Sequence, residues 1–414
     1  MSTRVLIVGG GAAGFFAAIA CAEAGPACRV TVVDSHRDVL AKVRLSGGGR
    51  CNLSHDCAAV DELVANYPRG RRELVSVFHR FGVRQTLDWF RQRGVAVRTL
   101  DDGCVFPVSD SAETVAECLL REARRCGVRI LTRSKVVQLR RDGERFQAQV
   151  EGGEAFVADA VLIATGGSRS LAGYTLPASL GHTIVPPVPS LYGLRVREPA
   201  LHAMAGIVLP EVAVVAPEQG VQAEGALLVT HEGVSGPAVL RLSSLGAREF
   251  HAAGYRFPLS ICWVGSARRE EAGEELRGAR QNWGRRQVHA HPLCALPQRL
   301  WEWLVDGSGI APATRWAELT REQLTALERR LLECPIAASG KATTQEEFVT
   351  CGGVSLKEVD FRRMASRLCP GLFFAGEVLD LDGFTGGFNL QAAWSTGWLA
   401  GQAMADLCRN AEPA

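Results

Sequence analysis

The sequence predicts an α/β fold whose parallel sheet is assembled from both ends of the chain, with a long insertion between them. The first observation is residues 5–34, which read as a strand, a glycine turn, a helix, a second strand and an acid. The second is the continuous apolar run 160–164, typical of a strand buried in a parallel sheet. The third is a similar run at 372–375, which is followed by the glycine-rich residues 376–389 and a helix expected from about 390 to 407.

The first of these segments carries a dinucleotide-binding fingerprint, because residues 9–14 fit the pattern G-x-G-x-x-G between a strand and a helix. Gly9 permits the tight turn, Gly11 lets backbone approach a pyrophosphate, and Gly14 lets the helix pack on the strand. The helix N-terminus offers free N–H groups and a positive dipole end to phosphates. Asp34 lies 20 residues after Gly14, within reach of ribose hydroxyls. These features predict a Rossmann-like domain.

The rest of the first third continues the α/β pattern. Thr165-Gly166-Gly167 come directly after the buried strand, where glycines again allow a ligand to approach the backbone. The other elements expected here are a helix at 112–126, strands at 128–131 and 135–139, and a hairpin of 146–150 and 155–157 that turns at 151–154.

The middle of the chain has a different character. Prolines at 186, 187 and 189 mark a linker, after which short β-rich runs predict an antiparallel sheet or barrel. From 268 to about 338 the chain is polar, helix-rich and tryptophan-bearing. We therefore expect a first domain piece at 1–190, an inserted β-barrel-like domain at 191–266, a small inserted helical domain at 267–345 and a second domain piece at 346–414.

Composition excludes some classes of protein. A net charge of +2 over 414 residues indicates neither a nucleic-acid-coating nor a membrane-surface protein, so we expect no membrane and no DNA partner. The 13 cysteines form no C-x-x-C pair, so no metal site is expected. A secretory signal over residues 5–25 is disfavoured, because it would not require glycines at this spacing. These features predict a cytoplasmic protein with reduced thiols; they do not indicate its oligomeric state.

Two polar segments are candidates for binding or catalysis. Residues 42–52 contain three consecutive glycines whose amides can face a ligand, with Lys42 and Arg50 placed to neutralise phosphate. A plain flexible loop is the alternative. Residues 230–237 carry His231, which we consider as a proton donor or substrate contact, although a single loop histidine is usually neither.

The segment 376–391 favours a flavin over a nicotinamide cofactor. A helix that begins near Gly387 aims its positive end at the group before it. Reduced flavin carries negative charge that such a helix stabilises, and nicotinamide has no comparable need. The alternative is a glycine-rich turn that only packs two elements.

Together these segments resemble the YhiN/BaiN-like family of bacterial flavoproteins over essentially the whole chain. The most specific motifs are Ser46-Gly47-Gly48-Gly49-Arg50-Cys51-Asn52 and the glycine-rich segment 376–391. The resemblance implies a Rossmann-like FAD-binding domain in two sequence pieces, an inserted β-barrel-like domain and a small helical domain. Two departures, Phe388 in place of a frequent tyrosine and a looser 360–366 segment, suggest a divergent subgroup.

The resemblance also implies which residues hold FAD. Gly9, Gly11, Ala13 and Gly14 would hold the pyrophosphate and Asp34 the ribose. The flavin side would be lined by Lys42, Ser46, Gly48, Arg50 and Asn52. The ribityl chain and ring would contact Gly376, Glu377, Gly387, Asn389 and Leu390. The other expected cofactor-binding residues are Ala12, Ser35, Gly47, Cys51, Val137, Thr165, Gly166 and Gly386.

Members of that family look like reductases of conjugated C=C bonds in steroid-type substrates, dihydrouridine synthases acting on ribosomal RNA, or oxidases of small amines such as aminoacetone. We expect an FAD-dependent oxidoreductase that passes hydride from reduced flavin N5 to an activated C=C bond, with NADH or NADPH as electron donor. The other two reactions are alternatives, as is a non-enzymatic flavin-binding sensor.

Two residues are candidate proton donors for such a reduction. Cys51 lies in the glycine loop expected near the ring, and its alternative role is that of a small packing residue; His231 is the rival acid. The expected partner is a small-molecule substrate or a structured RNA. The arginine-rich stretch 268–299 would serve RNA, although its glutamates favour a solvated helical face.

Overall fold

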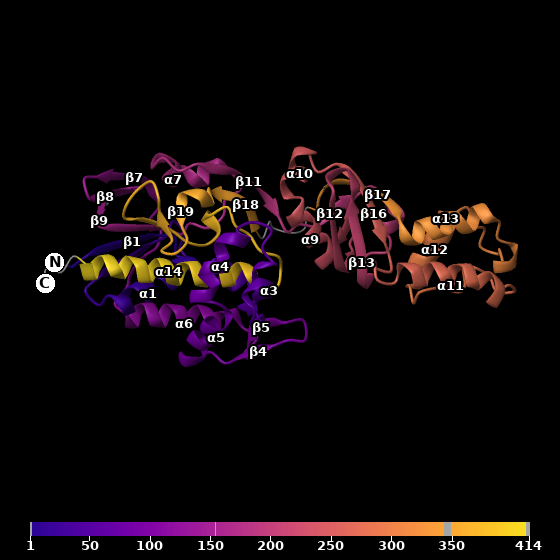
Figure 1. Cartoon of the computed structure of the whole chain (residues 1–414), viewed down its shortest axis with the longest axis horizontal. Coiled ribbons are helices and arrows are strands. Elements are labelled where there is room, and N and C mark those ends of the chain that lie inside the picture. Colours follow the sequence, from indigo (N-terminus) through magenta and orange to yellow (C-terminus); the bar gives the residue numbers. More distant parts are fainter. Residues whose placement is uncertain (1, 154, 343–348, 411–414) are drawn as a thin grey trace. The chain divides into compact units, whose positions relative to one another are not determined.

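The computed structural model describes residues 2–153, 155–342 and 349–410, and the chain forms two compact units (Figure 1). The split unit combines Met1–Val188 with Val349–Ala414, and the insertion unit is Pro189–Phe348. The expected boundary at 190/191 lies two residues from the observed one. The boundary expected at 345/346, like residue 154 of the expected hairpin turn, falls outside the described residues.

The split unit is built on a seven-stranded sheet of order β19-β20-β21-β10-β1-β2-β6. Its parallel part joins strands from both pieces, because β21 of the second piece pairs with β10 of the first, with Leu162 opposite Phe373. The short strands β19 and β20 add an antiparallel edge. The strands are β1 (Arg4–Val8), β2 (Arg29–Val33), β6 (Arg129–Leu131), β10 (Ala160–Ile163), β19 (Val359–Asp360), β20 (Ala365–Ser366) and β21 (Leu372–Phe374).

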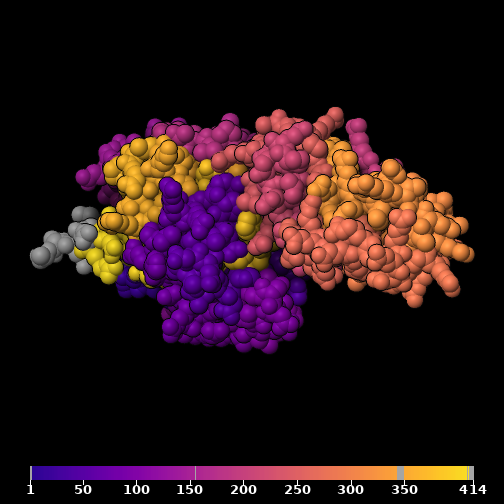
Figure 2. All heavy atoms as spheres, turned by 45° about the vertical axis from the view of Figure 1, so that its right-hand side comes forward, coloured from indigo at the N-terminus to yellow at the C-terminus, as the bar shows by residue number. Residues whose placement is uncertain are grey.

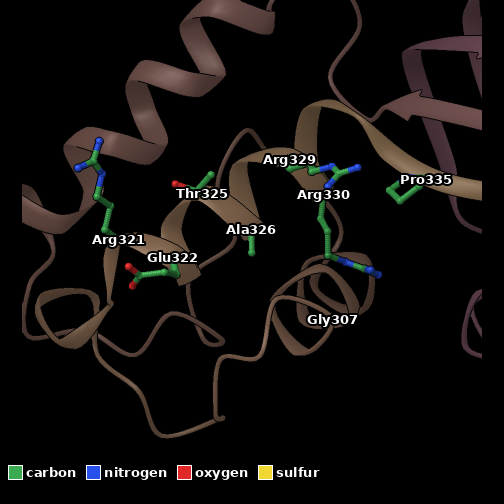
Figure 3. Close-up of a pocket in the computed structure, with 8 residues that line it drawn as sticks. All are labelled: Gly307, Arg321, Glu322, Thr325, Ala326, Arg329, Arg330 and Pro335. Atoms are coloured by element: carbon green, nitrogen blue, oxygen red, sulfur yellow. The ribbon is translucent and has the colours of Figure 1, made fainter.

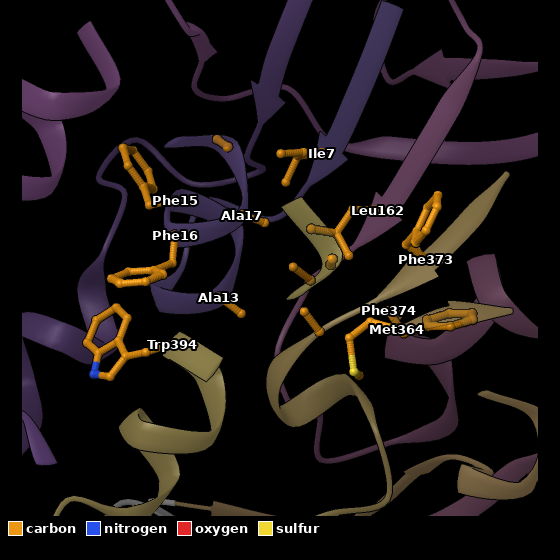
Figure 4. Close-up of a cluster of buried hydrophobic side chains, with 14 of the residues drawn as sticks. Ile7, Ala13, Phe15, Phe16, Ala17, Leu162, Met364, Phe373, Phe374 and Trp394 are labelled. Atoms are coloured by element: carbon orange, nitrogen blue, oxygen red, sulfur yellow. The ribbon is translucent and has the colours of Figure 1, made fainter. Parts of the chain in front are cut away.

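Helix α1 (Ala12–Ala24) and helix α14 (Phe388–Asn410) pack against each other at close range. A Cβ on Gly397 of α14 would lie 2.5 Å from the Ala13 carbonyl oxygen, so glycine is needed for this approach. Figure 4 shows Phe16 of α1 facing Trp394 of α14, with ring centroids 5.4 Å apart. The core therefore ties the last helix of the chain to the first.

Smaller elements surround this centre. The remaining helices of the split unit are α2 (Ala41–Leu45), α3 (Val60–Val64), α4 (Arg71–Arg80), α5 (Val83–Gln92), α6 (Ala112–Arg125) and α7 (Thr175–Ser179). Its minor sheets are β3 (Ser54–His55) with β4 (Val97–Thr99) and β5 (Cys104–Pro107), and β7 (Val136–Asp142) with β8 (Arg145–Val150) and β9 (Ala155–Ala158). Strand β11 (Ile184–Ser190) pairs with β18 (Val349–Val354). In the space-filling view, yellow residues of the second piece lie directly against indigo residues of the first (Figure 2).

The insertion unit contains a closed six-stranded barrel of order β12-β15-β14-β13-β16-β17. The strands are β12 (Leu194–Val196), β13 (Val208–Ala216), β14 (Val221–Val229), β15 (Gly233–Ser235), β16 (Phe257–Cys262) and β17 (Cys334–Lys341). The helices are α8 (Pro199–His202), α9 (Pro237–Leu245), α10 (Ala247–Ala252), α11 (Arg269–Asn282), α12 (Gln298–Asp306) and α13 (Arg321–Leu332).

One expectation for this unit is wrong. Residues 334–338 were expected in the helical domain, but they belong to β17, which pairs with both β12 and β16 and closes the barrel. The start of this strand alternates buried and exposed residues, as a barrel strand does. One hydrophobic core runs from the barrel into the helices, so both parts stabilise each other.

The structure also bears on two expectations drawn from composition, the one about a membrane and the one about the cysteines. Within the described ranges, no helix is long and apolar enough to cross a membrane. Most cysteines with described side chains are free thiols, but Cys28 is disulfide-bonded, which corrects the expectation that all thiols are reduced.

Candidate functional site

The glycine turn after β1 has three packed glycines, Gly9, Gly10 and Gly14, and one open glycine, Gly11. A Cβ on Gly9, whose φ is +113°, would lie 2.3 Å from the Ala164 carbonyl oxygen of the neighbouring strand end. A Cβ on Gly14 would lie 2.0 Å from the Gly9 carbonyl oxygen, whereas a Cβ on Gly11 would meet no atom within 4 Å. The turn is thus compressed on its protein side and open at Gly11.

The N-terminus of α1 is free of side-chain caps. Gly11 makes no capping hydrogen bond, and the first turn carries no acid. The first intrahelical bond runs from the Phe15 N–H to the Gly11 carbonyl oxygen at 3.0 Å, so the N–H groups of Ala12, Ala13 and Gly14 precede it. Uncapped N–H groups at the positive end of a helix, beside open space, fit a pyrophosphate.

Asp34 has a structural task that its position in the sequence did not suggest. Its Oδ2 accepts the Gly10 N–H at 2.7 Å, and its Oδ1 accepts the His36 N–H at 2.7 Å. The carboxylate therefore holds the glycine turn against the end of β2. Oδ1 also lies 3.2 Å from the Nδ1 atom of the His36 ring, whereas Oδ2 keeps a lone pair for a further donor, which fits the predicted ribose contact.

The predicted glycine loop is open on its outer side. Gly47, Gly48 and Gly49 have positive φ values of 59°, 68° and 86°. A Cβ on Gly47 would lie 2.8 Å from the Asn52 nitrogen, but one on Gly48 or Gly49 would meet nothing within 4 Å. The Arg50 guanidinium lies over the Phe106 ring, 4.5 Å from its centroid, and its Nε donates to the Gly47 carbonyl oxygen at 3.3 Å.

The structure brings this loop to the start of α14. The Asn52 amide is oriented so that its oxygen accepts the Gly387 N–H at 3.3 Å and its nitrogen donates to the Ser54 carbonyl at 3.0 Å. A Cβ on Gly387 would lie 2.5 Å from the Ser54 carbonyl oxygen, so only glycine fits there. Two segments that lie more than 300 residues apart in the sequence therefore form one corner of the unit.

A buried polar network anchors that corner, and the sequence analysis assigned no role to its members. Gln391 accepts the Ser54 hydroxyl at 2.6 Å and donates to the hydroxyls of Thr86 at 2.8 Å and Ser395 at 2.9 Å. All four side chains are buried, and such satisfied networks favour one arrangement of the backbone. The position of Gln391 directly after the glycine motif was the one available signal.

The N-terminus of α14 has the predicted free donors. Its first intrahelical bond joins the Gln391 N–H to the Gly387 carbonyl oxygen at 3.0 Å, so the N–H groups of Phe388, Asn389 and Leu390 precede it. The Asn389 side chain is engaged with Gly383, whose N–H it accepts and whose carbonyl it binds, both at 2.8 Å. Asn389 can therefore offer a ligand its backbone N–H, while its side chain shapes the preceding loop.

Lys42 and Glu377 form an ion pair within the same region. Lys42 Nζ lies 2.5 Å from Glu377 Oε2, and Glu377 Oε1 accepts the Thr350 N–H at 2.8 Å. In this structure the Lys42 ammonium is thus matched by a carboxylate, so neutralising phosphate is not its only task. A Cβ on Gly376 would lie 2.9 Å from the Ala13 Cβ, which places this segment beside the start of α1.

The predicted proton donor Cys51 is buried in this structure. Its side chain is 0% exposed and belongs to the main hydrophobic core. Burial raises the pKa of the Cys51 thiol to about 12, and a hydrogen bond with Ser46 opposes this only in part. Burial and the raised pKa favour the packing role for Cys51, and its role as proton donor stays a prediction.

The other predicted residues are placed as follows. His231 is exposed at the turn between β14 and β15 of the insertion unit. Thr165 and Gly166 follow β10, and a Cβ on Gly166 would meet nothing within 4 Å. Val137 on β7 is 45% exposed, Ser35 is exposed beside Asp34, and a Cβ on Gly386 would lie 3.3 Å from His55 Nδ1. In the part of the chain that the structure describes, no three metal-ligating side chains gather.

Two further contacts hold the loop before α14. The Tyr67 hydroxyl donates to the Phe388 carbonyl oxygen at 2.6 Å, and the buried carboxylate of Asp382 pairs with Arg69. Tyr67 and Arg69, which make these two contacts, lie in a stretch of the sequence that shows no motif.

Comparisons with known proteins agree with this arrangement. The model of the HI0933-like protein Rossmann domain matches residues 3–403. A 3-dehydro-bile acid delta(4,6)-reductase of Clostridium scindens is 30% identical over 97% of this chain and 99% of its own length. A ribosomal RNA dihydrouridine synthase of Escherichia coli is 30% identical over 96% of each chain.

Solved structures share the fold at low identity. The 3-ketosteroid delta1-dehydrogenase of Sterolibacterium denitrificans aligns with a TM-score of 0.53 and 11% identity over 98% of this chain and 100% of that one. A 3-ketosteroid-delta4-(5alpha)-dehydrogenase of Rhodococcus jostii aligns at 0.51 and 14% over 97% of each. The resemblance seen in the sequence is confirmed: the chain belongs to the HI0933-like family of FAD-dependent oxidoreductases.

Proposed function

We propose that this protein is a reductase that saturates an activated C=C bond of a small-molecule substrate. The observation that carries the proposal is the full-length similarity to a relative named as a bile acid delta(4,6)-reductase, whose 30% identity spans 97% of this chain. When bound, the flavin would supply the hydride at N5. The chain's own residues bind and orient it.

Those residues divide into two groups. The uncapped start of α1 and the carboxylate of Asp34 would hold the pyrophosphate and ribose. The corner of Asn52 and Gly387, with the free N–H groups at the start of α14, would stabilise negative charge on the reduced ring. NADH or NADPH is the proposed electron donor.

The test is anaerobic. The flavin is first reduced with NADH or NADPH. A conjugated 3-oxo steroid, a uridine-containing ribosomal RNA fragment or oxygen is then added to separate samples of the reduced enzyme. Aminoacetone is added to a separate sample of the oxidised enzyme. We expect the enone to restore the oxidised flavin spectrum and to gain two hydrogens by mass. Re-oxidation by oxygen alone would contradict the proposal, and flavin that no nicotinamide reduces would favour a sensor.

A substitution at the open glycine tests where the cofactor binds. Gly11→Val places its Cβ where the structure has no atom within 4 Å, so we expect the protein to fold normally. The same side chain would occupy the space at the helix end, so we expect no FAD and no turnover. Retention of FAD by this variant would show that the cofactor is held elsewhere.

A second candidate is a dihydrouridine synthase acting on ribosomal RNA, the name of a relative of equal identity. The arginine-rich stretch supports it less than expected, since Arg268, Arg269 and Arg277 pair with Glu271, Glu333 and Glu328. A different surface favours it. A hollow of about 750 Å³ beside α13 is lined by Arg321, Arg329 and Arg330 (Figure 3).

The two candidates separate by binding. RNA that contacts these arginines releases counterions, so its affinity should fall steeply with salt and with Arg321→Ala plus Arg329→Ala. A fragment of ribosomal RNA that restores the oxidised spectrum, when the enone does not, would establish the RNA reaction. An enone reaction without salt-dependent RNA binding would exclude it.

A further inference from the structure

A cleft of about 650 Å³ in the insertion unit gathers basic side chains, of which only His231, a candidate proton donor, has a predicted role in the reaction. Its charged and imidazole-bearing lining consists of three arginines, two histidines and two glutamates: Arg195, Arg197, Arg256, His202, His231, Glu198 and Glu232. We propose that this cleft binds the carboxylate or phosphate group of a small molecule.

The turn that carries His231 is built rigidly. Thr230 and Gly233 exchange backbone hydrogen bonds of 2.8 and 3.3 Å, and the Thr230 hydroxyl accepts the N–H groups of Glu232 and Gly233. A Cβ on Gly233 would lie 2.2 Å from the Leu194 carbonyl oxygen, so only glycine lets the turn lie this close to β12. The Val196 N–H also donates to the Glu232 carbonyl at 3.1 Å. His231 is therefore held at a defined place.

The arginines converge on the same place by strand geometry. Arg195 lies opposite Gly233 in the pairing of β12 with β15, and Arg197 directly follows the last residue of β12. Arg256 directly precedes β16, whose first residue Phe257 pairs with β17. Three separate segments of the barrel thus contribute to the cleft: the β12 segment gives two guanidinium groups, the turn before β15 gives the imidazole of His231, and the residue before β16 gives one more guanidinium group.

The charges of the cleft are incompletely matched within the unit. Arg195 lies 3.7 Å from Glu232, which is an ion pair but a loose one. Arg197, Arg256 and His231 have no side-chain hydrogen bond or ion pair with any residue that the structure describes. Guanidinium groups bind carboxylates and phosphates with paired N–H donors, so an oxyanion is the ligand that this set recognises.

A small anion fits better than a polynucleotide. The basic groups face one compact cleft, whereas an RNA backbone requires cations spread along its phosphates. The proposal does not rest on the reaction proposed above, because it concerns equilibrium binding and can be measured without turnover.

The experiment is calorimetric titration of the FAD-loaded protein with inorganic phosphate and, separately, with acetate. Bound FAD blocks the pyrophosphate site, so the probes report on the remaining cationic sites. We expect the double variant Arg197→Ala, Arg256→Ala to bind the better probe at least ten-fold more weakly. The double variant Arg197→Lys, Arg256→Lys should be intermediate, because it keeps the charge but loses the paired donors.

The control is Arg280→Ala with Arg285→Ala, which removes the same charge from two exposed arginines outside the cleft. We expect it to bind the probes like the parent. Stronger binding of phosphate or of acetate identifies which anion the cleft prefers, and either order supports the proposal. Equal affinity of the parent and the Arg197/Arg256 variant, equal losses in the control, or binding of a ribosomal RNA fragment but of neither probe would overturn it. Unchanged circular dichroism and flavin absorbance would show that the variants are folded.

Discussion

Replacement of Gly397 by alanine tests the contact on which the cofactor site is built. The added Cβ would lie 2.5 Å from the Ala13 carbonyl oxygen, and real Cβ atoms stay beyond 3.0 Å from such atoms. Because the nearest atoms belong to the backbone of Ala13, no side chain can rotate away. Helices α1 and α14 must therefore separate by about 0.5 Å or more, the difference between these two distances.

The energy of that change has two parts. Overpacking of this kind costs about 1–3 kcal/mol. Alanine is the better helix former by about 0.8–1 kcal/mol, which offsets part of the loss. Gly278→Ala in α11 is the matched control, because its Cβ would meet only Asn282 Nδ2, at 3.6 Å. The propensity gain is common to both variants, so Gly397→Ala should be less stable than Gly278→Ala by about 1–3 kcal/mol.

The same displacement should weaken FAD binding, since Ala13 lies in the first turn of α1. The assay is the FAD content after dialysis, together with thermal unfolding followed by flavin fluorescence. A shift of about 2–4 °C per kcal/mol is expected for a unit of this size. A Gly397→Ala protein that keeps its FAD and melts at or above the parent temperature would refute the reasoning about the helix contact.

Three other predictions follow from the site. Cys51→Ala should retain turnover and lose about 1 kcal/mol of stability, and Cys51 should resist thiol reagents at pH 8, because burial raises its pKa to about 12. Removal of Lys42 or Glu377 should lower FAD affinity, and a double-mutant cycle should show a coupling of about 1 kcal/mol or less, since Lys42 is exposed. Burial lowers the pKa of His182 below 6.5, so the unfolded chain binds the proton at a higher pH than the folded chain does. The free energy of unfolding should therefore fall as the pH drops below about 6.5. His182→Gln should flatten that pH dependence in urea titrations from pH 7.5 to 5.

Each of these has a control in the same chain. Cys21→Ala removes another buried thiol of raised pKa, so loss of product formation in Cys51→Ala alone would restore the proton-donor role. The exposed pair Lys135 and Glu151, 3.9 Å apart, should show no coupling energy. If its coupling energy equals that of Lys42 with Glu377, the Lys42 pair is no more than a surface contact. His79→Asn changes an exposed histidine, and a flattened profile there would remove His182 as the cause.

The sequence predicted the elements that depend on neighbouring residues better than those that depend on residues far apart in the chain. Residues 5–34 were predicted nearly to the residue, because the strand, the turn and the helix are specified by neighbours in the chain. Strand β17 was missed, because it follows a helix and is defined by pairing with β12, more than 130 residues earlier. Strand propensity depends on the surrounding sheet, so a strand defined by distant partners carries little local signal.

The candidate site shows the same limit. The two glycine segments were recognised separately, but the bonds from Asn52 to Gly387 and from Ser54 to Gln391 cross more than 330 residues. Nothing local to Cys51 distinguishes a thiol beside a ligand from one in the core, and its burial depends on residues from the whole split unit. The ion pair of Lys42 with Glu377 is invisible for the same reason.

By itself, the sequence determined the α/β fold, the dinucleotide fingerprint and the preference for FAD, because helix ends, glycine turns and apolar periodicity are local properties of the chain. Only the tertiary structure decided which groups face each other. It closed the barrel with β17, buried Cys51, matched Lys42 with Glu377 and gathered the basic side chains around His231. Burial and pairing depend on distant residues brought together by folding, and these two quantities decide which of the candidate side chains can do chemistry.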